Sequence, residues 1–429
     1  MSRTLIEAEK AHIWHPFTPM QQWCAAEHEP LLLTRGEGCW LWDQHGNRYL
    51  DGNASIWTNI HGHQHPRINA AIAAQLARVA HTSFLGFTHE PAIKLAQALV
   101  GLFPERTLTK VFYSDNGSTA IESAVRMALQ YWKQNGQPER DGILAFDAAY
   151  HGDTLGAASL GGIPLFKGSA QDFGYAVTRV ADMQALARLP EAAVSRLAAV
   201  IIEPLIQGAA GMRLWPTGML RELATWCRER DIFLILDEVM TGFGRTGRMF
   251  ACEHEGVEPD FLCLAKGLTG GYLPLAATLT TQRVFEGFLG DGRAFYYGHS
   301  YTASQLGCAA ALASLEIFAE ESVLEQLPAK VARLTALLEP FRTHPRVLSV
   351  RQCGLIAGIE VGQRREPRVE YPAAALIGAK ICASARKHGL LTRPIVNTLV
   401  LMPPLCINES EMAHMVEALQ RALEEICGT

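Results

Sequence analysis

The chain has 429 residues, of which 48% are hydrophobic and 19% are charged, and its formal net charge is −5. This composition is typical of a globular protein with a large apolar core, and it excludes a disordered or fibrous chain. With 38 basic against 43 acidic residues and no basic stripe, the sequence offers no electrostatic basis for binding nucleic acid or an anionic membrane.

The N-terminal segment, residues 1–65, predicts a small antiparallel meander. Its first ten residues, MSRTLIEAEK, lack the apolar core of a signal peptide. The run LLLTRGEGCWLWDQHGNRYLDG (31–52) alternates apolar and polar residues between glycine and asparagine turns. The segment is too short to bury a core alone, so we expect it to pack on the C-terminal part of the chain.

From residue 66 onward, helices and short apolar strands alternate. Helical periodicity covers 66–80 and 90–103. Near-continuous apolar strands separated by helices predict an α/β fold with a buried, mainly parallel sheet. The predicted strands are 109–115, 142–150, 197–205, 232–240, 260–268 and 272–280.

A helix over 304–322 leads into the last section of the chain. This section carries the strand-like runs 347–361, 390–395 and 398–405, with helices between them. We therefore expect a large domain over 66–325 and a smaller α+β domain built from 1–65 and 326–429.

Ten cysteines are scattered singly, with no CxxC pair, which predicts reduced thiols in a protein of the cytoplasm; a zinc site is the weaker alternative. No apolar run reaches the roughly 18 residues of a membrane span. Glu203, Asp237 and Lys266 interrupt the most hydrophobic segments.

Two charged residues lie at the ends of predicted buried strands. In the run IFLILDEVM (232–240), Asp237 follows the apolar residues, with Val239 expected on its face of the strand and Glu238 on the other. Lys266 follows the strand 29 residues later and precedes several glycines. Ligands of open parallel sheets bind beyond the carboxyl ends of the strands. The pair is either a buried ion pair or a reactive centre, since buried lysines shift their pKa readily and form Schiff bases.

Two further strand ends carry polar groups. Asn116, Gly117 and Ser118 open a helix, where free N–H groups and a hydroxyl suit an anion, although this motif alone favours a plain helix cap. Tyr150 and His151 follow another strand. A lysine, an acid, an anion site and an aromatic ring together match pyridoxal 5'-phosphate.

The motifs LILDEVMTGFGRTG and LAKGLTGGYLPLAAT resemble those of the class III aminotransferases, which are fold type I pyridoxal-phosphate enzymes. The resemblance spans almost the whole chain. Within that class, HIWHPFTPM, DGNASIWTNIHGHQHP, AYHGDT and YGHSYTASQLGCAAAL resemble the enzymes that form 7,8-diaminononanoate in biotin biosynthesis. The resemblance implies transamination of 8-amino-7-oxononanoate by a ping-pong mechanism, in a cytoplasmic homodimer.

The resemblance also implies the residues that bind the cofactor. Lys266 corresponds to the lysine that forms the Schiff base, and Asp237 to the acid that faces the pyridine nitrogen. Tyr150 corresponds to the ring that stacks on the cofactor. Gly117 and Ser118 correspond to residues that bind its phosphate.

Further positions match residues that complete the site. Gly298, His299 and Ser300 correspond to a segment contributed by the second subunit of a dimer, with Ser300 on the phosphate. Arg393, in LLTRP, corresponds to the arginine that binds the substrate carboxylate.

The amino donor stays open between lysine and S-adenosylmethionine. Relatives that use S-adenosylmethionine typically carry a tyrosine and a pair of tryptophans at positions where this chain has Phe17 and the sequence Ile56-Trp57. Phe17 lacks the tyrosine hydroxyl, and Ile56 lacks one aromatic wall. We therefore predict lysine or a similar diamine as the donor.

Other functions are weaker alternatives. One is another class III ω-amine or diamine aminotransferase, and a second is a non-catalytic or nucleotide-binding protein on the same scaffold. The run GFGRTG (242–247) matches GxGxxG, but no acid-ended strand follows at the spacing that a dinucleotide fold requires. His61, His63 and His65 alternate on one short loop, where turn and packing roles are more common than metal binding, so we expect no metal.

Overall fold

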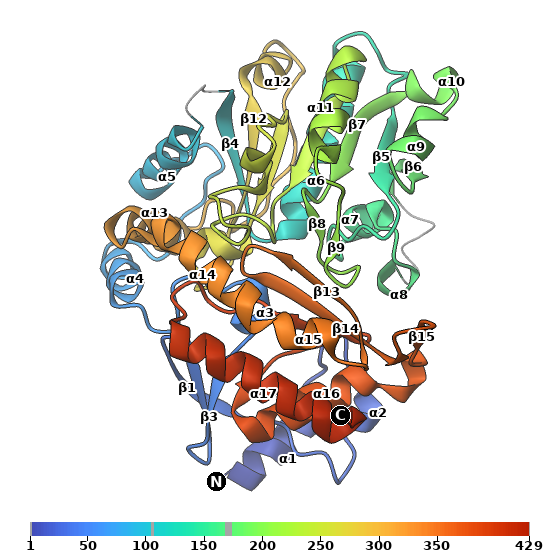
Figure 1. Cartoon of the computed structure of the whole chain (residues 1–429). Helices are drawn as coiled ribbons and strands as arrows, with labels where there is room; N and C mark the ends of the chain where they lie inside the picture. The colour runs from blue at the N-terminus through green and yellow to red at the C-terminus, as the bar shows by residue number, and fades with distance from the viewer. Residues whose placement is uncertain (1, 104–106, 168–173, 429) are drawn as a thin grey trace.

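A mainly parallel seven-stranded sheet forms the centre of the upper part of the molecule in Figure 1. The computed structural model describes residues 2–103, 107–167 and 174–428. Neighbouring strands run parallel, except that β12 is antiparallel to both β4 and β11. The predicted α/β fold is confirmed. In spatial order the strands are β4 (Leu108–Ser114), β12 (Ala276–Thr281), β11 (Phe261–Leu264), β10 (Phe233–Asp237), β7 (Leu197–Ile202), β5 (Gly142–Phe146) and β6 (Ala176–Val180).

Both faces of the inner part of this sheet are covered, which explains why its inner strands are buried and almost entirely apolar. In β10, Phe233 and Ile235 pack with the helix α6 on one face, while Leu234 and Leu236 pack into the larger core on the other. The helices of this part of the chain are α4 (Pro66–Arg78), α5 (Glu90–Gly101), α6 (Gly117–Gln134), α7 (Leu155–Leu160), α8 (Pro164–Lys167), α9 (Met183–Ala187), α10 (Glu191–Val194), α11 (Met219–Glu229), α12 (Gln282–Glu286) and α13 (Gln305–Glu320).

Two features of the sheet differ from the predicted pattern. The edge strand β6 was not predicted. Among the described residues it pairs with β5 alone, and most of its side chains are partly exposed, so it lacks the apolar run of a central strand. The strand β12 begins at Ala276, four residues after the predicted start. Tyr272 through Leu275 instead form a loop.

The N-terminal meander is confirmed and contacts the C-terminal part of the chain. Strands β1 (Leu33–Glu37), β2 (Trp40–Asp43) and β3 (Arg48–Asp51) are antiparallel. Strand β16 (Leu390–Leu391) then adds parallel to β3. The two ends of the chain thus share one sheet, as expected. The domain boundaries after residues 65 and 325 stay a prediction.

The C-terminal section builds a second, antiparallel sheet in the lower part of Figure 1. The strands of this sheet are β13 (Val347–Cys353), β14 (Ile356–Arg364), β18 (Thr398–Leu401), β17 (Pro394–Ile395) and, paired with β14, β15 (Val369–Glu370).

No helix among the described residues is long and apolar enough to cross a membrane. The remaining elements are α1 (Ser2–His12), α2 (Met20–Trp23), α3 (Ala54–Trp57), α14 (Val323–Leu337), α15 (Glu339–Thr343), α16 (Ile377–Ala385), α17 (Glu409–Cys427), the short pair β8 (Ile206–Gln207) and β9 (Arg213–Leu214), and the 3₁₀ turns η2 (Ala251–His254), η3 (Lys266–Thr269), η4 (Ala373–Ala375) and η5 (Arg386–His388).

A buried arginine connects the central sheet to both chain ends. Arg245 lies in the turn after β10 and is 1% exposed. Its guanidinium donates to the carbonyl of Pro403 at 2.6 Å and to that of Asn59 at 2.7 Å. Burial lowers the pKa of Arg245 to about 10. The segment GFGRTG (242–247) forms turns and does not open a helix. Its arginine instead joins separate segments of the chain through the two buried hydrogen bonds.

We predict that Arg245→Met lowers the free energy of unfolding by about 3 kcal/mol, because two buried carbonyls lose their charged donor. Denaturant unfolding of both proteins measures this difference. The exposed Arg188→Met serves as the control. Equal unfolding free energies for Arg245→Met and the control would contradict the prediction.

Candidate active site

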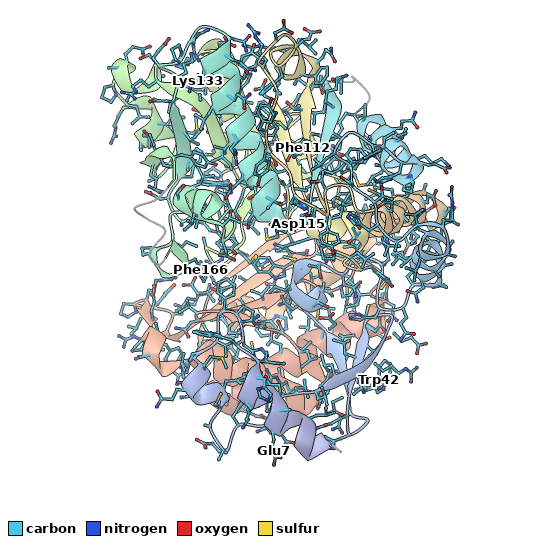
Figure 2. All side chains as sticks on the ribbon, turned by 180° about the vertical axis from the view of Figure 1, so that it is seen from behind. Glu7, Trp42, Phe112, Asp115, Lys133 and Phe166 are labelled. Atoms are coloured by element: carbon cyan, nitrogen blue, oxygen red, sulfur yellow. The ribbon has the colours of Figure 1, made fainter. Side chains whose placement is uncertain are left out.

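A cavity of about 1030 Å³ lies where the carboxyl ends of the central strands meet the terminal segments. Figure 2 labels two of its lining residues, Asp115 and Phe166, near the boundary between the upper and lower parts of the molecule. Nine of the predicted site residues line the cavity: Phe17, Ile56, Trp57, Gly117, Ser118, Tyr150, Asp237, Lys266 and Arg393.

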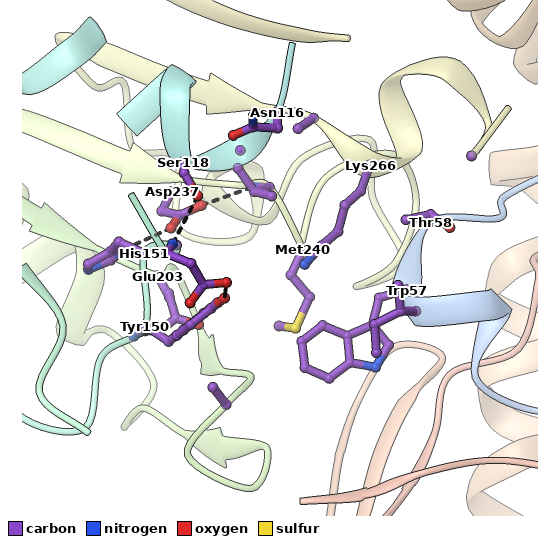
Figure 3. Close-up of a pocket in the computed structure, with 18 of the residues that line it drawn as sticks. Trp57, Thr58, Asn116, Ser118, Tyr150, His151, Glu203, Asp237, Met240 and Lys266 are labelled. Atoms are coloured by element: carbon purple, nitrogen blue, oxygen red, sulfur yellow. Dashed lines mark hydrogen bonds and ion pairs between the residues drawn. The ribbon is translucent and has the colours of Figure 1, made fainter. Parts of the chain in front are cut away.

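Lys266 and Asp237 reach the cavity because their strands are parallel neighbours. Asp237 pairs in register with Cys263, three residues before the lysine. Lys266 adopts a left-handed backbone, with φ of 44°. Its Nζ lies 4.8 Å from the centre of the Trp57 ring, and Figure 3 shows the side chain extending toward that ring. Burial lowers the pKa of Lys266 to about 8, although Asp237 and Glu203 oppose the shift.

Asp237 is fixed by two donors at the end of β10. Its Oδ2 lies 2.7 Å from Nδ1 of His151, and its Oδ1 accepts the Val239 N–H at 3.1 Å. His151 is buried, and its Nε2 has no hydrogen-bond partner within the described part of the chain. The carboxylate therefore keeps a defined orientation at the cavity wall (Figure 3).

The neighbouring Glu238 points away from the cavity, as strand alternation predicts. It accepts the N–H groups of Ala251 at 2.7 Å and Cys252 at 2.8 Å and the hydroxyl of Thr241 at 3.0 Å. Burial raises the pKa of Glu238 to about 7. This acid supports the loop after β10 and has no place among the lining residues.

The start of α6 forms a narrow polar corner of the cavity. Asn116 caps the helix by accepting the Thr119 N–H at 3.1 Å, and the Ser118 hydroxyl accepts the Asp153 N–H at 3.0 Å. A Cβ at Gly117 would lie 2.7 Å from Cγ1 of Val239, so only glycine fits there. An 18-residue helix whose first turn faces a cavity is suited to bind a phosphate.

Aromatic rings form one wall. Tyr150 donates from its hydroxyl to Oδ2 of Asp153 at 2.6 Å, and burial raises its pKa above the ordinary value. Its ring centre lies 5.5 Å from that of Phe166, which lies 5.9 Å from that of Phe17. Phe166 was missed in the sequence, because it comes from the four-residue helix α8, which has no motif or periodicity.

Glu203 is a second lining residue without a predicted role in the site. It follows β7 and accepts the N–H of Tyr150 at 3.1 Å and of Gly208 at 2.9 Å. Burial raises the pKa of Glu203 to about 7. The sequence feature that pointed to Asp237, an acid at the end of a buried strand, is also present at Glu203.

The terminal segments supply the opposite wall. Trp57 donates from Nε1 to Oδ1 of Asn53 at 2.9 Å, at the end of the kinked helix α3. Ser55 and Trp57 both have positive φ values, 62° and 66°, which turn Ile56 and the indole toward the cavity. Arg393 lies between β16 and β17 and is exposed at the cavity mouth.

The predicted segment 298–300 does not line this chain's cavity. His299 Nε2 lies 3.7 Å from Oδ1 of Asp115, which does line it. The His299 N–H donates to the hydroxyl of Thr302 at 3.0 Å. The part of Gly298, His299 and Ser300 in a partner's site stays a prediction.

The three alternating histidines have separate partners. His61 pairs with Ser314 at 3.1 Å. His63 contacts Asp51 and His65 contacts Glu321, each at 3.0 Å. No group of three or more potential metal ligands occurs among the described residues.

A mainly parallel sheet, with a lysine and an aspartate at the carboxyl ends of two neighbouring inner strands, is the arrangement of the fold type I pyridoxal-phosphate transferases. A family model for class III aminotransferases matches residues 23–423. The chain therefore belongs to the class III aminotransferases and is an aminotransferase.

Relatives named adenosylmethionine-8-amino-7-oxononanoate aminotransferase match nearly the whole chain, and two of them serve as examples. The protein of Geobacter sulfurreducens is 43% identical, covering 100% of this chain and 99% of the relative. That of Nitratidesulfovibrio vulgaris is 46% identical, covering 98% of this chain and 82% of the relative.

Solved structures give the same assignment of the fold. The crystal structure of adenosylmethionine-8-amino-7-oxononanoate aminotransferase from Methanocaldococcus jannaschii matches with a TM-score of 0.96 at 40% identity, covering 99% of this chain and 100% of that one. An (S)-enantioselective omega-transaminase from Thermomicrobium roseum matches with a TM-score of 0.94 at 33% identity, covering 99% of each chain.

The raised pKa of Glu203 predicts a pH-dependent contribution to stability. Because the folded pKa of about 7 exceeds the ordinary 4.5, the folded state holds this proton more tightly, and stability falls as pH rises through this window. Glu203→Gln cannot lose this proton. We therefore expect its unfolding free energy to fall less than that of the wild type as pH rises, by up to about 3 kcal/mol.

Denaturant unfolding of the wild type and the variant across this pH window measures the difference in slope. The exposed Glu139→Gln is the matched control and should keep the wild-type slope. Parallel pH profiles for wild type and Glu203→Gln would refute the assignment of the shift to this residue.

Proposed function

We propose that this aminotransferase converts 8-amino-7-oxononanoate to 7,8-diaminononanoate, a step of biotin biosynthesis, with pyridoxal 5'-phosphate as cofactor. The observation that carries the proposal is the convergence of Lys266, Asp237, the start of α6 and Arg393 on one cavity. The names of the full-length relatives support the choice of substrate.

The residues present fit this cofactor. Gly117 leaves room at the start of α6 that any Cβ would fill, and Ser118 adds a hydroxyl for the phosphate. Lys266 supplies the amine for the cofactor aldehyde, and Asp237 the anion for the pyridine nitrogen. Tyr150 supplies a ring to stack on. When bound, the cofactor supplies an electron sink for the carbon that bears the amine.

The chain's own groups prepare each part of the reaction. His151 and the Val239 N–H hold Asp237 in one orientation, which favours a protonated pyridine nitrogen. Lys266, with a pKa of about 8, is able to take and return a proton near neutral pH. The Trp57 ring, whose centre lies 4.8 Å from Lys266 Nζ, would shield this amine from water.

The same cavity accepts the substrate by charge and by apolar contact. Arg393 at the mouth provides a guanidinium for the substrate carboxylate, which it is able to bind bidentately. The apolar side chains Phe17, Ile56 and Trp57 line a path for the aliphatic chain between the carboxylate and the reacting amine.

The active assembly we propose is a homodimer in the cytoplasm. Gly298, His299 and Ser300 would complete the phosphate site of the partner subunit. The ten cysteines are free thiols, which supports a reducing compartment.

We predict that Lys266→Ala folds but loses turnover by at least about 10³-fold, because the covalent anchor and the proton carrier disappear together. Single-turnover assays with 8-amino-7-oxononanoate measure the loss. Borohydride should fix the cofactor covalently to the wild type and to the exposed-site control Lys387→Ala, but not to Lys266→Ala. Wild-type turnover by Lys266→Ala would reject the proposed function.

We predict lysine or a similar slim diamine as the amino donor. Replacing Phe17 by Tyr and Ile56 by Trp should restore a hydroxyl and an aromatic wall, and should move the specificity ratio toward S-adenosylmethionine by about tenfold or more. Bleaching of the cofactor's visible band by each donor, in wild type and double variant, measures the ratio. Efficient bleaching by S-adenosylmethionine alone in the wild type would overturn this preference.

The alternative is another class III ω-amine aminotransferase, favoured by the exposed Ile56 in the cavity lining and by the likeness to the Thermomicrobium roseum enzyme. The second half-reaction distinguishes the two. Return of the visible band on adding 8-amino-7-oxononanoate supports the proposed substrate, and return only with other ketones or aldehydes supports the alternative.

A further inference from the structure

Two cysteines from opposite ends of the chain are in direct contact. Cys39 lies in the turn between β1 and β2, and Cys406 follows β18. Their Sγ atoms are 3.4 Å apart, although 367 positions separate the residues in the sequence. Neither residue lines the active-site cavity, so the contact is separate from the site described above.

The backbone around the two thiols is tightly fixed. Gly38 and His63 exchange two hydrogen bonds, of 3.0 and 2.7 Å, and the Leu405 N–H donates to Ile60 at 2.8 Å. Gly62, with φ of +90°, allows this approach, because a Cβ there would lie 2.9 Å from Cys406 Sγ and 3.0 Å from the Gly38 Cα. The three segments therefore keep the thiols together.

The two cysteines differ in exposure. Cys406 is an exposed residue and Cys39 is 2% exposed, although burial opposes the thiolate form at both sulfurs. The hydrogen bond from Cys39 lowers the pKa of Cys406, while the same contact and burial raise the pKa of Cys39. Of the charged groups that face the pair, Lys330 favours the Cys406 thiolate and Glu411 opposes it.

We propose that Cys39 and Cys406 form an oxidative modification site, at which a hydroperoxide converts the two thiols into a reversible disulfide. The Cys406 thiolate attacks the peroxide oxygen, giving a sulfenic acid and, after protonation, one molecule of water or alcohol. The Cys39 sulfur then displaces hydroxide from that sulfenic acid. A second water leaves, and the two thiols have supplied the two electrons that reduce the peroxide.

The geometry suits the second step. The sulfurs need to approach only from 3.4 Å to about 2.05 Å for the bond to form. The bond would join the N-terminal meander to the segment after β18. Because it closes a very long loop, it should raise the thermal midpoint of unfolding.

The test uses the purified, reduced full-length holoenzyme treated with hydrogen peroxide. After alkylation of free thiols, peptide mass mapping should recover a Cys39–Cys406 disulfide, and thiol titration should show a loss of two of the ten thiols. The thermal midpoint should rise. Dithiothreitol should reverse all three changes.

Variants separate the two steps. Cys39→Ser should stop Cys406 at the sulfenic acid, which dimedone traps, and Cys406→Ser should slow thiol loss by about tenfold or more. The control Cys24→Ser removes another exposed cysteine and should keep the disulfide. Recovery of Cys39 as a free thiol in oxidised wild-type protein, with Cys406 free or overoxidised, would overturn the proposal. None of these measurements depends on the substrate of the enzyme.

Discussion

The organisation of the site depends on a carboxylate at the end of an otherwise apolar strand. The side chains of β10 before Asp237 are buried in the two cores on either face of the sheet, and this acid is itself only 6% exposed, so its charge needs partners within the protein. His151 and the Val239 N–H supply that stabilisation. Because β11 is parallel and in register, Lys266 emerges beside the acid, and both charges face the same cavity.

The second constraint is the attachment of the two chain ends to the central sheet. Arg245 bonds to the carbonyls of Asn59 and Pro403, and the Met402 N–H donates to Gly52 at 2.8 Å. These contacts position the kinked segment that carries Trp57. One wall of the cavity thus depends on residues more than 300 positions apart in the sequence, and the site forms only when both chain ends are folded.

The sequence predicted the central part of this arrangement because its signals are local. Asp237 and Lys266 follow apolar strands, and Gly117 and Ser118 open a long amphipathic helix. Phe166 could not be predicted, because a four-residue helix leaves no periodic pattern. The run around Arg245 has the spacing of a nucleotide motif, yet its arginine is buried between segments, a role that depends on contacts no single-sequence pattern records.

The charges of the cavity bear on the choice of donor in the proposed function. It is lined by four acidic and two basic side chains: Asp115, Asp153, Glu203, Asp237, Lys266 and Arg393. A bound phosphate ester adds further negative charge near the start of α6. With Glu203 near a pKa of 7, part of this excess is relieved by a proton and the rest attracts cations. Lysine brings a second ammonium group and S-adenosylmethionine brings a sulfonium, so the charge of the cavity suits both donors. The choice between them therefore depends on shape, and the absence of an aromatic wall at Ile56 favours the slimmer diamine.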